Sequence, residues 1–320
     1  MKALLLPDLA IVERPDPTPG EGELLVAVGA VGLNRADLLQ RLGRYPAPPG
    51  WPADIPGLEY AGTVTALGAG ATRFAVGDRV MGLVGGGAMA ERLVIHQDEA
   101  IAVPDCLTIQ QAAAVPEAFL TAWDALVLRG RAESGDRVLI HAVGSGVGTA
   151  AVQFAPLLGV TVIGSSRTAD KLERCLALGM AHGVLTGNND WPASVGGPVQ
   201  VIIDTLGASA LAANLGLLAP LGRLVVLGTM TGSEAAIDLG VVLRKRLTIV
   251  GTAMRNRGPV ERRALMSRFS AEVLPHLASG ALRPLLAATL PIAEAARGYD
   301  LLASNTTLGK VVLVWPPTNQ

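Results

Sequence analysis

The sequence predicts an α/β protein with two domains, one rich in β-strands and one built on a doubly wound parallel sheet. Three observations lead to this prediction. A chain of 320 residues is longer than one ordinary domain. Its first third contains short strands separated by glycine-rich turns and little helix. Its middle third alternates short apolar strands with helical segments, which is typical of a parallel sheet with helices on both faces.

Elements near the two ends of the chain define the β-rich domain. One short helix is expected over residues 35–41, and the proline-rich segment 45–56 is expected to be a loop. Two helices are expected from about Pro259, followed by a final strand over 310–315 that returns to this domain. The other strands are expected at 23–28, 59–67, 78–83 and 90–95.

The middle of the chain supplies the parallel sheet. Its strands are expected at 138–141, 161–163, 199–203, 223–227 and 248–250, and its helices at 147–158, 169–178 and 208–218. We therefore expect residues 1–115 and 254–320 to form the first domain and residues 116–253 the second.

Composition limits the classes of function. Lys and Arg number 26 and Asp and Glu 27, so a net charge of −1 argues against nucleic acid or an anionic membrane as a partner. No apolar stretch approaches the ~20 residues of a membrane-spanning helix. The two cysteines, Cys106 and Cys175, are too few for a disulfide framework or a four-cysteine zinc site. We expect a soluble, cytoplasmic protein.

A glycine-rich turn links the first strand of the parallel sheet to the helix that follows it. The turn carries Gly144, Ser145, Gly146, Val147 and Gly148. Glycine lets the backbone approach a pyrophosphate, and the N-terminus of a helix offers N–H groups and a positive dipole end to phosphates. The spacing is G-x-G-x-G rather than G-x-G-x-x-G, and a turn without a ligand is the alternative. The α/β pattern around the turn favours a dinucleotide.

The end of the second strand distinguishes the two nicotinamide dinucleotides. NAD enzymes usually place an acid there, about 20 residues after the glycine turn, to bind the ribose 2′-OH. Here the segment holds Ser165, Ser166 and Arg167, with Lys171 one helical turn later. Hydroxyls and cations suit a 2′-phosphate, although Arg and Lys are also common at a solvated helix start. The segment therefore favours NADPH.

Three more positions are candidates for cofactor contact. Gly228 and Thr229 follow a strand at the carboxyl edge of the sheet, where dinucleotides lie. Lys310, near the end of the chain, is the third. An ordinary strand-end turn explains each of them equally well.

Several motifs, in this order, carry a resemblance to a known family. They are NRADLLQR at 34–41, GRYP at 43–46, PGLEYAG at 56–62, LTAW at 120–123, SGVG at 145–148 and GKVVL at 309–313. The chain resembles, over essentially its whole length, the zinc-independent quinone oxidoreductase branch of the medium-chain dehydrogenases/reductases. It is most similar to the NADPH:quinone reductase subgroup known from a tumour-suppressor-inducible animal member. The chain departs from the family pattern at Thr186, where a Tyr is common, and in the placing of Gly144.

The resemblance implies a GroES-like catalytic domain split around a Rossmann cofactor domain, with nicotinamide and substrate in the cleft between them. Zinc-dependent relatives place Cys at the position of Asn34 and His at that of Leu58, and Asn and Leu are poor zinc ligands. Hydride transfer would then proceed without a metal, helped by hydrogen-bond donors. The resemblance also places Thr121 on the nicotinamide side. Glu59, which lies beside the metal in zinc-dependent relatives, should pair internally.

Tyr45, Ser145 and Asn34 are the candidate catalytic residues. Tyr45 lies in a loop expected to face the cleft, and it offers either a phenol to a substrate oxygen or aromatic packing for the loop. Ser145 can donate a hydrogen bond to the substrate or the nicotinamide amide, or only cap the helix. Asn34 can bind the nicotinamide ribose or fix its own turn.

The sequence favours NADPH-dependent reduction of quinones. Reduction of an activated C=C bond in enones or enoyl thioesters uses the same hydride chemistry, and the sequence does not separate the two. A cofactor-binding protein with a structural or RNA-regulatory role is the alternative from another class, against which the neutral charge and the intact Tyr45, Asn34 and Ser145 argue. The apolar strand at 247–250 would lie at a sheet edge, so a homodimer is expected.

Overall fold

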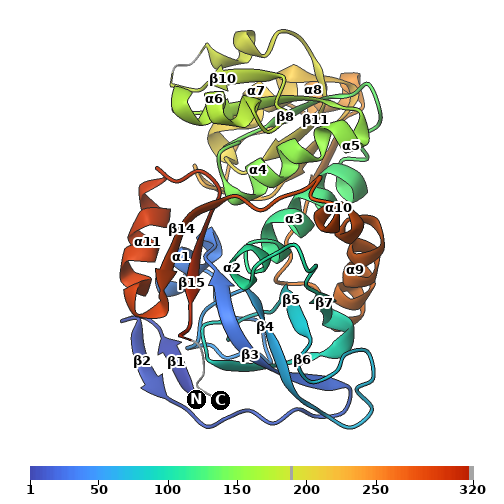
Figure 1. The fold of residues 1–320 in the computed structure, drawn as a ribbon. Helices are drawn as coiled ribbons and strands as arrows, with labels where there is room; N and C mark the ends of the chain where they lie inside the picture. The colour runs from blue at the N-terminus through green and yellow to red at the C-terminus, as the bar shows by residue number, and fades with distance from the viewer. Residues whose placement is uncertain (188–189, 317–320) are drawn as a thin grey trace. The chain divides into compact units, whose positions relative to one another are not determined.

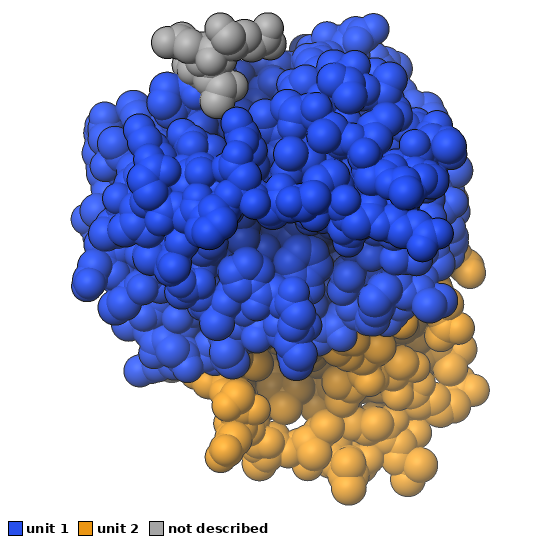
Figure 2. All heavy atoms as spheres, turned by 90° about the horizontal axis from the view of Figure 1, so that it is seen from below, with its two compact units in different colours: residues 1–117, 254–320 blue, residues 118–253 orange. Residues whose placement is uncertain are grey.

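The computed structural model describes residues 1–187 and 190–316, which form two compact units (Figure 2). Unit 1 consists of residues 1–117 and 254–320, and unit 2 of residues 118–253. The chain therefore passes into unit 2 after Glu117, two residues later than the sequence placed the boundary, and returns after Ala253. In the described ranges, every helix is too short or too polar to cross a membrane.

A seven-stranded sheet is the centre of unit 1 (Figure 1). Its strands follow the order β14-β15-β3-β4-β5-β7, and β6 also pairs with β3. Strand β15 runs antiparallel to β3, which confirms that the last predicted strand returns to the first domain. The strands of unit 1 are β1 (Lys2–Leu5), β2 (Ala10–Glu13), β3 (Glu23–Gly32), β4 (Glu59–Leu67), β5 (Arg79–Leu83), β6 (Arg92–His96), β7 (Ala100–Ala102), β14 (Leu286–Pro291) and β15 (Lys310–Val314).

Strand β3 shows why this sheet forms. Along most of its length, buried side chains alternate with partly exposed ones, so every second residue enters the core. Leu24, Val26 and Val28 are the buried set, and they belong to the main core of unit 1. Gly62 in the neighbouring β4 lies so close to β3 that a Cβ there would come within 2.2 Å of the Ala27 carbonyl oxygen. Only glycine fits this approach.

Helices border the sheet of unit 1. The helix expected at 35–41 is α1. The C-terminal part holds more elements than predicted, because strand β14 and helix α11 follow α9 and α10, and α11 lies beside β14 and β15 (Figure 1). The helices of unit 1 are α1 (Arg35–Arg41), η1 (Gln97–Glu99), α2 (Ile109–Ala112), α9 (Pro259–Glu272), α10 (Leu274–Ala278), η5 (Ile292–Glu294) and α11 (Ala295–Ser304).

A six-stranded parallel sheet forms the centre of unit 2. Its order is β10-β9-β8-β11-β12-β13, which in chain order is the 3-2-1-4-5-6 arrangement of dinucleotide-binding folds. The order reverses between β8 and β11, so a crevice for a ligand is expected at the carboxyl ends of these two strands. The strands are β8 (Arg137–Ile140), β9 (Thr161–Ser166), β10 (His182–Leu185), β11 (Val199–Asp204), β12 (Leu218–Val226) and β13 (Thr248–Gly251).

The helices of unit 2 correct two predictions. The continuous helix expected at 147–158 is two helices, because Pro156 has no N–H and its ring excludes a helical bond to the carbonyl of Val152. The helix expected to reach Leu218 ends one residue earlier, where β12 begins. The helices are α3 (Pro116–Trp123), which starts at the end of unit 1, η2 (Asp124–Arg129), α4 (Gly146–Gln153), α5 (Ala155–Leu158), α6 (Ala169–Leu176), η3 (Trp191–Val195), η4 (Ala208–Ala210), α7 (Leu211–Leu217) and α8 (Leu239–Lys245).

Candidate active site

The glycine-rich turn of unit 2 joins β8 to α4, which is the strand–turn–helix context that the sequence predicted. Ser145 is the N-cap of α4, and its Oγ accepts a hydrogen bond of 3.0 Å from the N–H of Gly148. The hydroxyl hydrogen of Ser145 is still free to be donated. A Cβ at Gly148 would lie 2.4 Å from the Val143 carbonyl oxygen, so glycine is needed where the helix packs on the turn.

The start of α4 suits a phosphate. The N–H groups of the first residues, Gly146 and Val147, have no acceptor inside the helix, and the helix dipole places positive potential at this end. Gly144 immediately precedes the cap. This geometry fits the pyrophosphate of a dinucleotide.

The four residues predicted to bind the adenosine phosphate, at and after the end of β9, have different surroundings. The side chain of Ser165 is buried, and its Oγ lies 2.7 Å from Nδ1 of His141. Ser166 Oγ accepts a hydrogen bond from the N–H of Thr168. Arg167 is exposed at the strand end, and Lys171 follows on α6.

The two cations at the end of β9 act on one another. Burial lowers the pKa of Lys171, and the neighbouring charge of Arg167 lowers it further. Two cations held close together favour an anionic ligand, because the ligand relieves their repulsion. This arrangement fits a 2′-phosphate.

Two hydroxyls of unit 2 are buried without a hydrogen-bond partner among the described residues. They are Oγ1 of Thr121 on α3 and Oγ1 of Thr205, directly after β11. A buried polar atom without a partner is unfavourable, so each hydroxyl is suited to bind a ligand atom. Gly228 and Thr229 follow β12, and the N–H of Met230 donates to the Thr205 carbonyl oxygen, which ties these two strand ends together. The unit-2 residues therefore fit a nicotinamide dinucleotide, and Thr205 is a candidate that the sequence did not single out.

The contacts of His141 suit a structural role. Its ring is buried, with Nε2 at 2.8 Å from Asn214 Oδ1 and an edge-to-face contact with Trp191. Burial lowers the pKa of His141, while Asn214 and the charge of Asp204 oppose that shift.

In unit 1, Glu59 is the centre of a buried polar cluster. One carboxylate oxygen, Oε1, lies 2.6 Å from Nζ of Lys310 and accepts a hydrogen bond of 2.9 Å from Nδ2 of Asn34. The other, Oε2, accepts from the backbone N–H of Glu117 at 2.8 Å. Glu59 is fully buried, so its charge is neutralised inside the protein, as the sequence predicted.

Lys310, a predicted cofactor contact, has its ammonium group bound inside unit 1. Its ammonium group has three hydrogens, and it donates to the Leu33 carbonyl oxygen at 2.7 Å and to Asn34 Oδ1 at 2.6 Å in addition to Glu59. Only 5% of the residue is exposed. The contacts of Lys310 also fix the Asn34 amide, whose Nδ2 donates to Gly32 and Glu59. Asn34 is therefore left with acceptor capacity on Oδ1.

Asp37 on α1 adjoins this cluster. Its carboxylate accepts hydrogen bonds from the backbone N–H groups of Asn34, at 2.7 Å, and Gly57, at 3.1 Å. Complete burial raises the pKa of Asp37 to about 6, against the lowering effects of those N–H groups and of Lys310. A structural role at the start of α1 explains these contacts.

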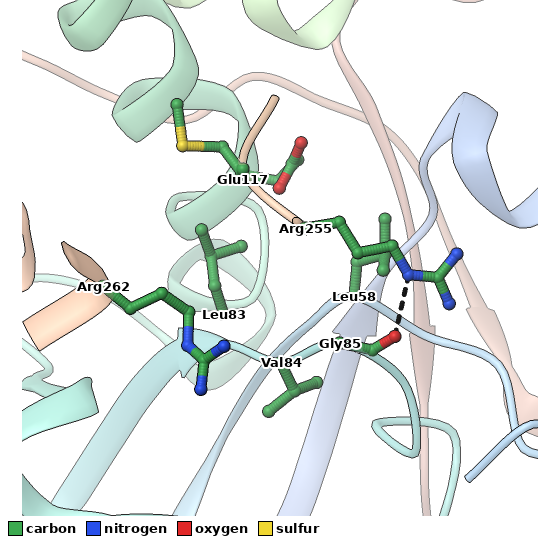
Figure 3. Close-up of a pocket in the computed structure, with 8 residues that line it drawn as sticks. Leu58, Leu83, Val84, Gly85, Glu117, Arg255 and Arg262 are labelled. Carbon is green, nitrogen blue, oxygen red and sulfur yellow. Dashed lines mark hydrogen bonds between the residues drawn. The ribbon is translucent and has the colours of Figure 1, made fainter. Parts of the chain in front are cut away.

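A small apolar pocket in unit 1 lies next to the cluster (Figure 3). Leu58, Leu83 and Val84 supply its apolar lining, and Glu117, Arg255 and Arg262 supply charge. Leu58 stands at the position where zinc-dependent relatives of this family pattern place a histidine. Within residues 1–187 and 190–316, no three His, Cys, Asp or Glu side chains are grouped to hold a metal ion.

Tyr45 is held beside Arg255. Its carbonyl oxygen accepts a hydrogen bond of 2.8 Å from Arg255, and the guanidinium lies 5.0 Å from the centre of its ring. Burial raises the pKa of Tyr45, the charge of Glu117 raises it further, and the charge of Arg255 opposes both. The sequence did not point to Arg255, which is 210 residues from Tyr45. The available signal was a charged residue four positions after the last apolar strand of the parallel sheet.

Two family models match the chain. The alcohol dehydrogenase GroES-like domain matches residues 20–105, and the zinc-binding dehydrogenase model matches residues 146–271. A GroES-like domain followed by a dinucleotide-type sheet defines the class of two-domain dehydrogenases and reductases.

Two curated relatives illustrate the similarity. The quinone oxidoreductase of Pseudomonas aeruginosa PAO1 is 31% identical over 303 residues, which is 92% of this chain and 92% of that protein. Polyketide synthase GfsB of Streptomyces halstedii is 34% identical over 302 residues, which is 93% of this chain but only 5% of that protein. The chain belongs to the medium-chain dehydrogenase/reductase superfamily.

Solved structures show the same two kinds of relative. The quinone oxidoreductase of Thermus thermophilus, also determined in complex with NADPH, is 34% identical with a TM-score of 0.85, over 98% of this chain and 100% of that one. The CurK enoyl reductase is 26% identical with a TM-score of 0.86, over 98% of this chain and 99% of that one. Quinone and enoyl reductases are thus similarly close to this chain.

Proposed function

We propose that the chain is a reductase that uses NADPH to reduce quinones without zinc. The observation that carries the proposal is the cluster around Glu59. Lys310 neutralises this carboxylate, Asn34 donates a hydrogen bond to it, and Leu58 lines the adjoining small pocket. With an ammonium group 2.6 Å from the carboxylate, a divalent cation there would face strong repulsion. Activation of the substrate then falls to hydrogen-bond donors.

NADPH would supply the hydride. The helix start at Gly146 would bind its pyrophosphate, and Arg167 and Lys171 would bind its 2′-phosphate. Thr121 and Thr205 have the unpartnered hydroxyls that could meet polar atoms of the cofactor. Tyr45 would donate a proton to the substrate oxygen on which negative charge develops.

Reduction of an activated C=C bond is the second candidate. It is favoured by the similarity to CurK enoyl reductase and to a segment of polyketide synthase GfsB. The same residues would serve, because hydride addition to an enone or enoyl thioester also places negative charge on a carbonyl oxygen.

A substrate panel separates the candidates. The purified chain is incubated with NADPH and, in turn, with benzoquinones, naphthoquinones, enones and an enoyl thioester, and the loss of NADPH absorbance is followed. We expect the highest kcat/KM with a quinone. A higher value for the enoyl thioester would favour the second candidate, and no turnover with any acceptor would contradict both.

A further inference from the structure

Arg255 is an almost buried cation that is bound only by neutral groups. It is 6% exposed. Its Nε donates to the Gly85 carbonyl oxygen at 2.8 Å (Figure 3), its Nη1 to the Tyr45 carbonyl oxygen at 2.8 Å and its Nη2 to Gln40 Oε1 at 2.7 Å. In the described part of the chain, no carboxylate forms an ion pair with it. A buried cation without a carboxylate in direct contact is unfavourable, which suggests that its position has another use.

The three hydrogen bonds join three separate segments. Gln40 is on α1, Tyr45 begins the proline-rich loop, and Gly85 follows β5. A planar guanidinium can hold all three acceptors in fixed directions, which an ammonium group cannot do. Arg255 therefore fixes the place of the Tyr45 loop within unit 1.

The same guanidinium acts on the Tyr45 ring. It lies 5.0 Å from the ring centre, where a cation stabilises the electron-rich face and, more strongly, a phenolate. Two charged groups therefore act on Tyr45: Arg255 favours its ionised form, and Glu117 disfavours it. Tyr45, Asp37 and Glu117 in turn favour the charged form of Arg255 against the effect of its burial.

We propose that Arg255 is a positioning residue that tunes Tyr45 as the proton donor, by holding its loop and by stabilising the phenolate that remains after proton transfer. This inference rests on the proposed function. In the reaction, the substrate receives a hydride from NADPH and a proton from the Tyr45 hydroxyl. The Tyr45 O–H bond breaks as the new O–H bond to the substrate forms, and the phenolate then regains a proton from water.

The ionisation of Tyr45 can be measured by itself, because the chain contains only three tyrosines. Tyr60 and Tyr299 are completely buried, and burial raises the pKa of each far above the usual range for tyrosine. In the folded protein, tyrosinate absorbance at alkaline pH therefore reports Tyr45, with Tyr45→Phe as the blank. Fluorine NMR of protein labelled with 3-fluorotyrosine gives the same comparison at lower pH, because fluorine acidifies the phenol.

Two charge changes should move the midpoint of the Tyr45 titration in opposite directions. Arg255→Met should raise it by about one pH unit, since it removes the charge that favours the phenolate. Glu117→Gln should lower it. Arg255→Lys keeps the charge and should keep a midpoint near that of the wild type, and Gln40→Leu, which removes only a neutral partner of Arg255, is the matched control. The alkaline limb of the kcat–pH profile should move with the midpoint in each variant.

A purely structural role for Arg255 gives a different result. Equal midpoints in the wild type and Arg255→Met would overturn the proposal, whatever happens to kcat. If Arg255→Met does not fold, Arg255→Gln removes the charge while keeping hydrogen-bond donors, and the same comparison applies. A shifted midpoint in a protein that reduces none of the panel substrates would support the coupling between Arg255 and Tyr45 and contradict the proposed function.

Discussion

The side chain of Lys310 sets both the charge beside Glu59 and the orientation of Asn34. Its ammonium group gives all three of its hydrogens to unit 1 and places a positive charge against the buried Glu59. The same contacts orient Asn34, so the amide can accept but no longer donate to a further ligand. A hydroxyl donor such as a ribose 2′-OH is the kind of group that Asn34 can still bind.

Arg167 should set the preference for NADPH. Arg167→Ala should weaken NADPH binding roughly 10-fold or more and leave NADH binding nearly unchanged, because a charged hydrogen bond contributes on the order of 1.5–3 kcal/mol. Fluorescence titration with each cofactor measures both constants. Arg174→Ala, which removes another exposed cation from α6, is the matched control. An equal loss for both cofactors in Arg167→Ala would contradict a 2′-phosphate contact.

Tyr45 should act through its hydroxyl. Tyr45→Phe keeps the ring beside Arg255 and removes the proton donor, so kcat should fall on the order of 10²-fold with little change in NADPH affinity. Steady-state kinetics on one quinone and one enone measure this effect. An unchanged kcat on both substrates would remove Tyr45 from the mechanism and leave Ser145 or water as the donor.

Sequence reasoning found candidate residues more easily than it found their contacts. Tyr45, Asn34 and Arg167 could be singled out from residue type and motif position. The same kind of signal points to Ser165 and Lys310 as cofactor contacts, yet Ser165 contacts His141, and Lys310 contacts Asn34 276 residues away. The direction of a side chain depends on partners far along the chain, which a linear pattern does not contain.

At the scale of elements, the stability that Asp37 contributes at the start of α1 depends on pH. Folding raises the pKa of Asp37 from 3.8 to about 6, so the folded state binds its proton more tightly than the unfolded state. The stability that this proton contributes is present below pH 3.8 and is lost as the pH rises through 6. Its loss amounts to about 3 kcal/mol at most.

Comparison with Asp37→Asn isolates this effect. The free energy of unfolding of the wild type, minus that of the variant, should decrease between about pH 4 and pH 6 and stay level above about pH 7. Urea unfolding at several pH values measures it, with the exposed Asp105→Asn as a control. A difference that increases over the same range would show that the hydrogen bonds from Asn34 and Gly57 outweigh burial.

The protein should form a dimer through the sheet edge at β13. Strand β13 pairs with β12 on one side only, and Ile249 on it is 41% exposed. Leu239 and Leu243 on the nearby part of the chain, α8, are 69% and 78% exposed. An apolar edge is usually covered, and a second copy that offers the same strand would extend the sheet.

Light scattering tests this expectation. The wild type should be a dimer at micromolar concentration, and Ile249→Lys should shift it toward a monomer because a charge would be buried at the interface. Val260→Lys, at an apolar residue of unit 1 that is 83% exposed, is the matched control. A monomeric wild type would contradict the dimer.

Elements with a clear apolar pattern were predictable, and elements without one were missed. Strand β4 and helix α1 have the predicted bounds. Strand β14 was missed because its residues Leu-Ala-Ala-Thr-Leu-Pro are small and only partly buried. Strand β10, His-Gly-Val-Leu, was missed because only Val184 in it is buried, so the segment has no apolar run. The break before α5 follows from Pro156, which the predicted continuous helix disregarded.

At the scale of the whole molecule, both points at which the chain changes units are anchored in unit 1. The N–H of Glu117, the last residue before unit 2, donates to Glu59. On the return, Arg255 is the second residue of unit 1 and binds three of its segments. Both links to unit 2 therefore adjoin residues that contact the candidate catalytic side chains of unit 1: Glu117 is bound to the Glu59 cluster, and Arg255 is bound to Tyr45.

The whole protein should work without zinc, even though one of its family models is named for zinc binding. Thiolate and imidazole ligands are replaced by Asn34 and Leu58, and the remaining carboxylate, Glu59, is already bound by Lys310 at 2.6 Å. A zinc ion would have to displace a buried ammonium group and would gain few ligands. Elemental analysis of protein grown with added zinc should find far less than one zinc per chain, and EDTA should leave NADPH-dependent turnover unchanged. A zinc-dependent alcohol dehydrogenase treated in parallel is the positive control, and about one tightly bound zinc per chain would show that other residues supply the ligands.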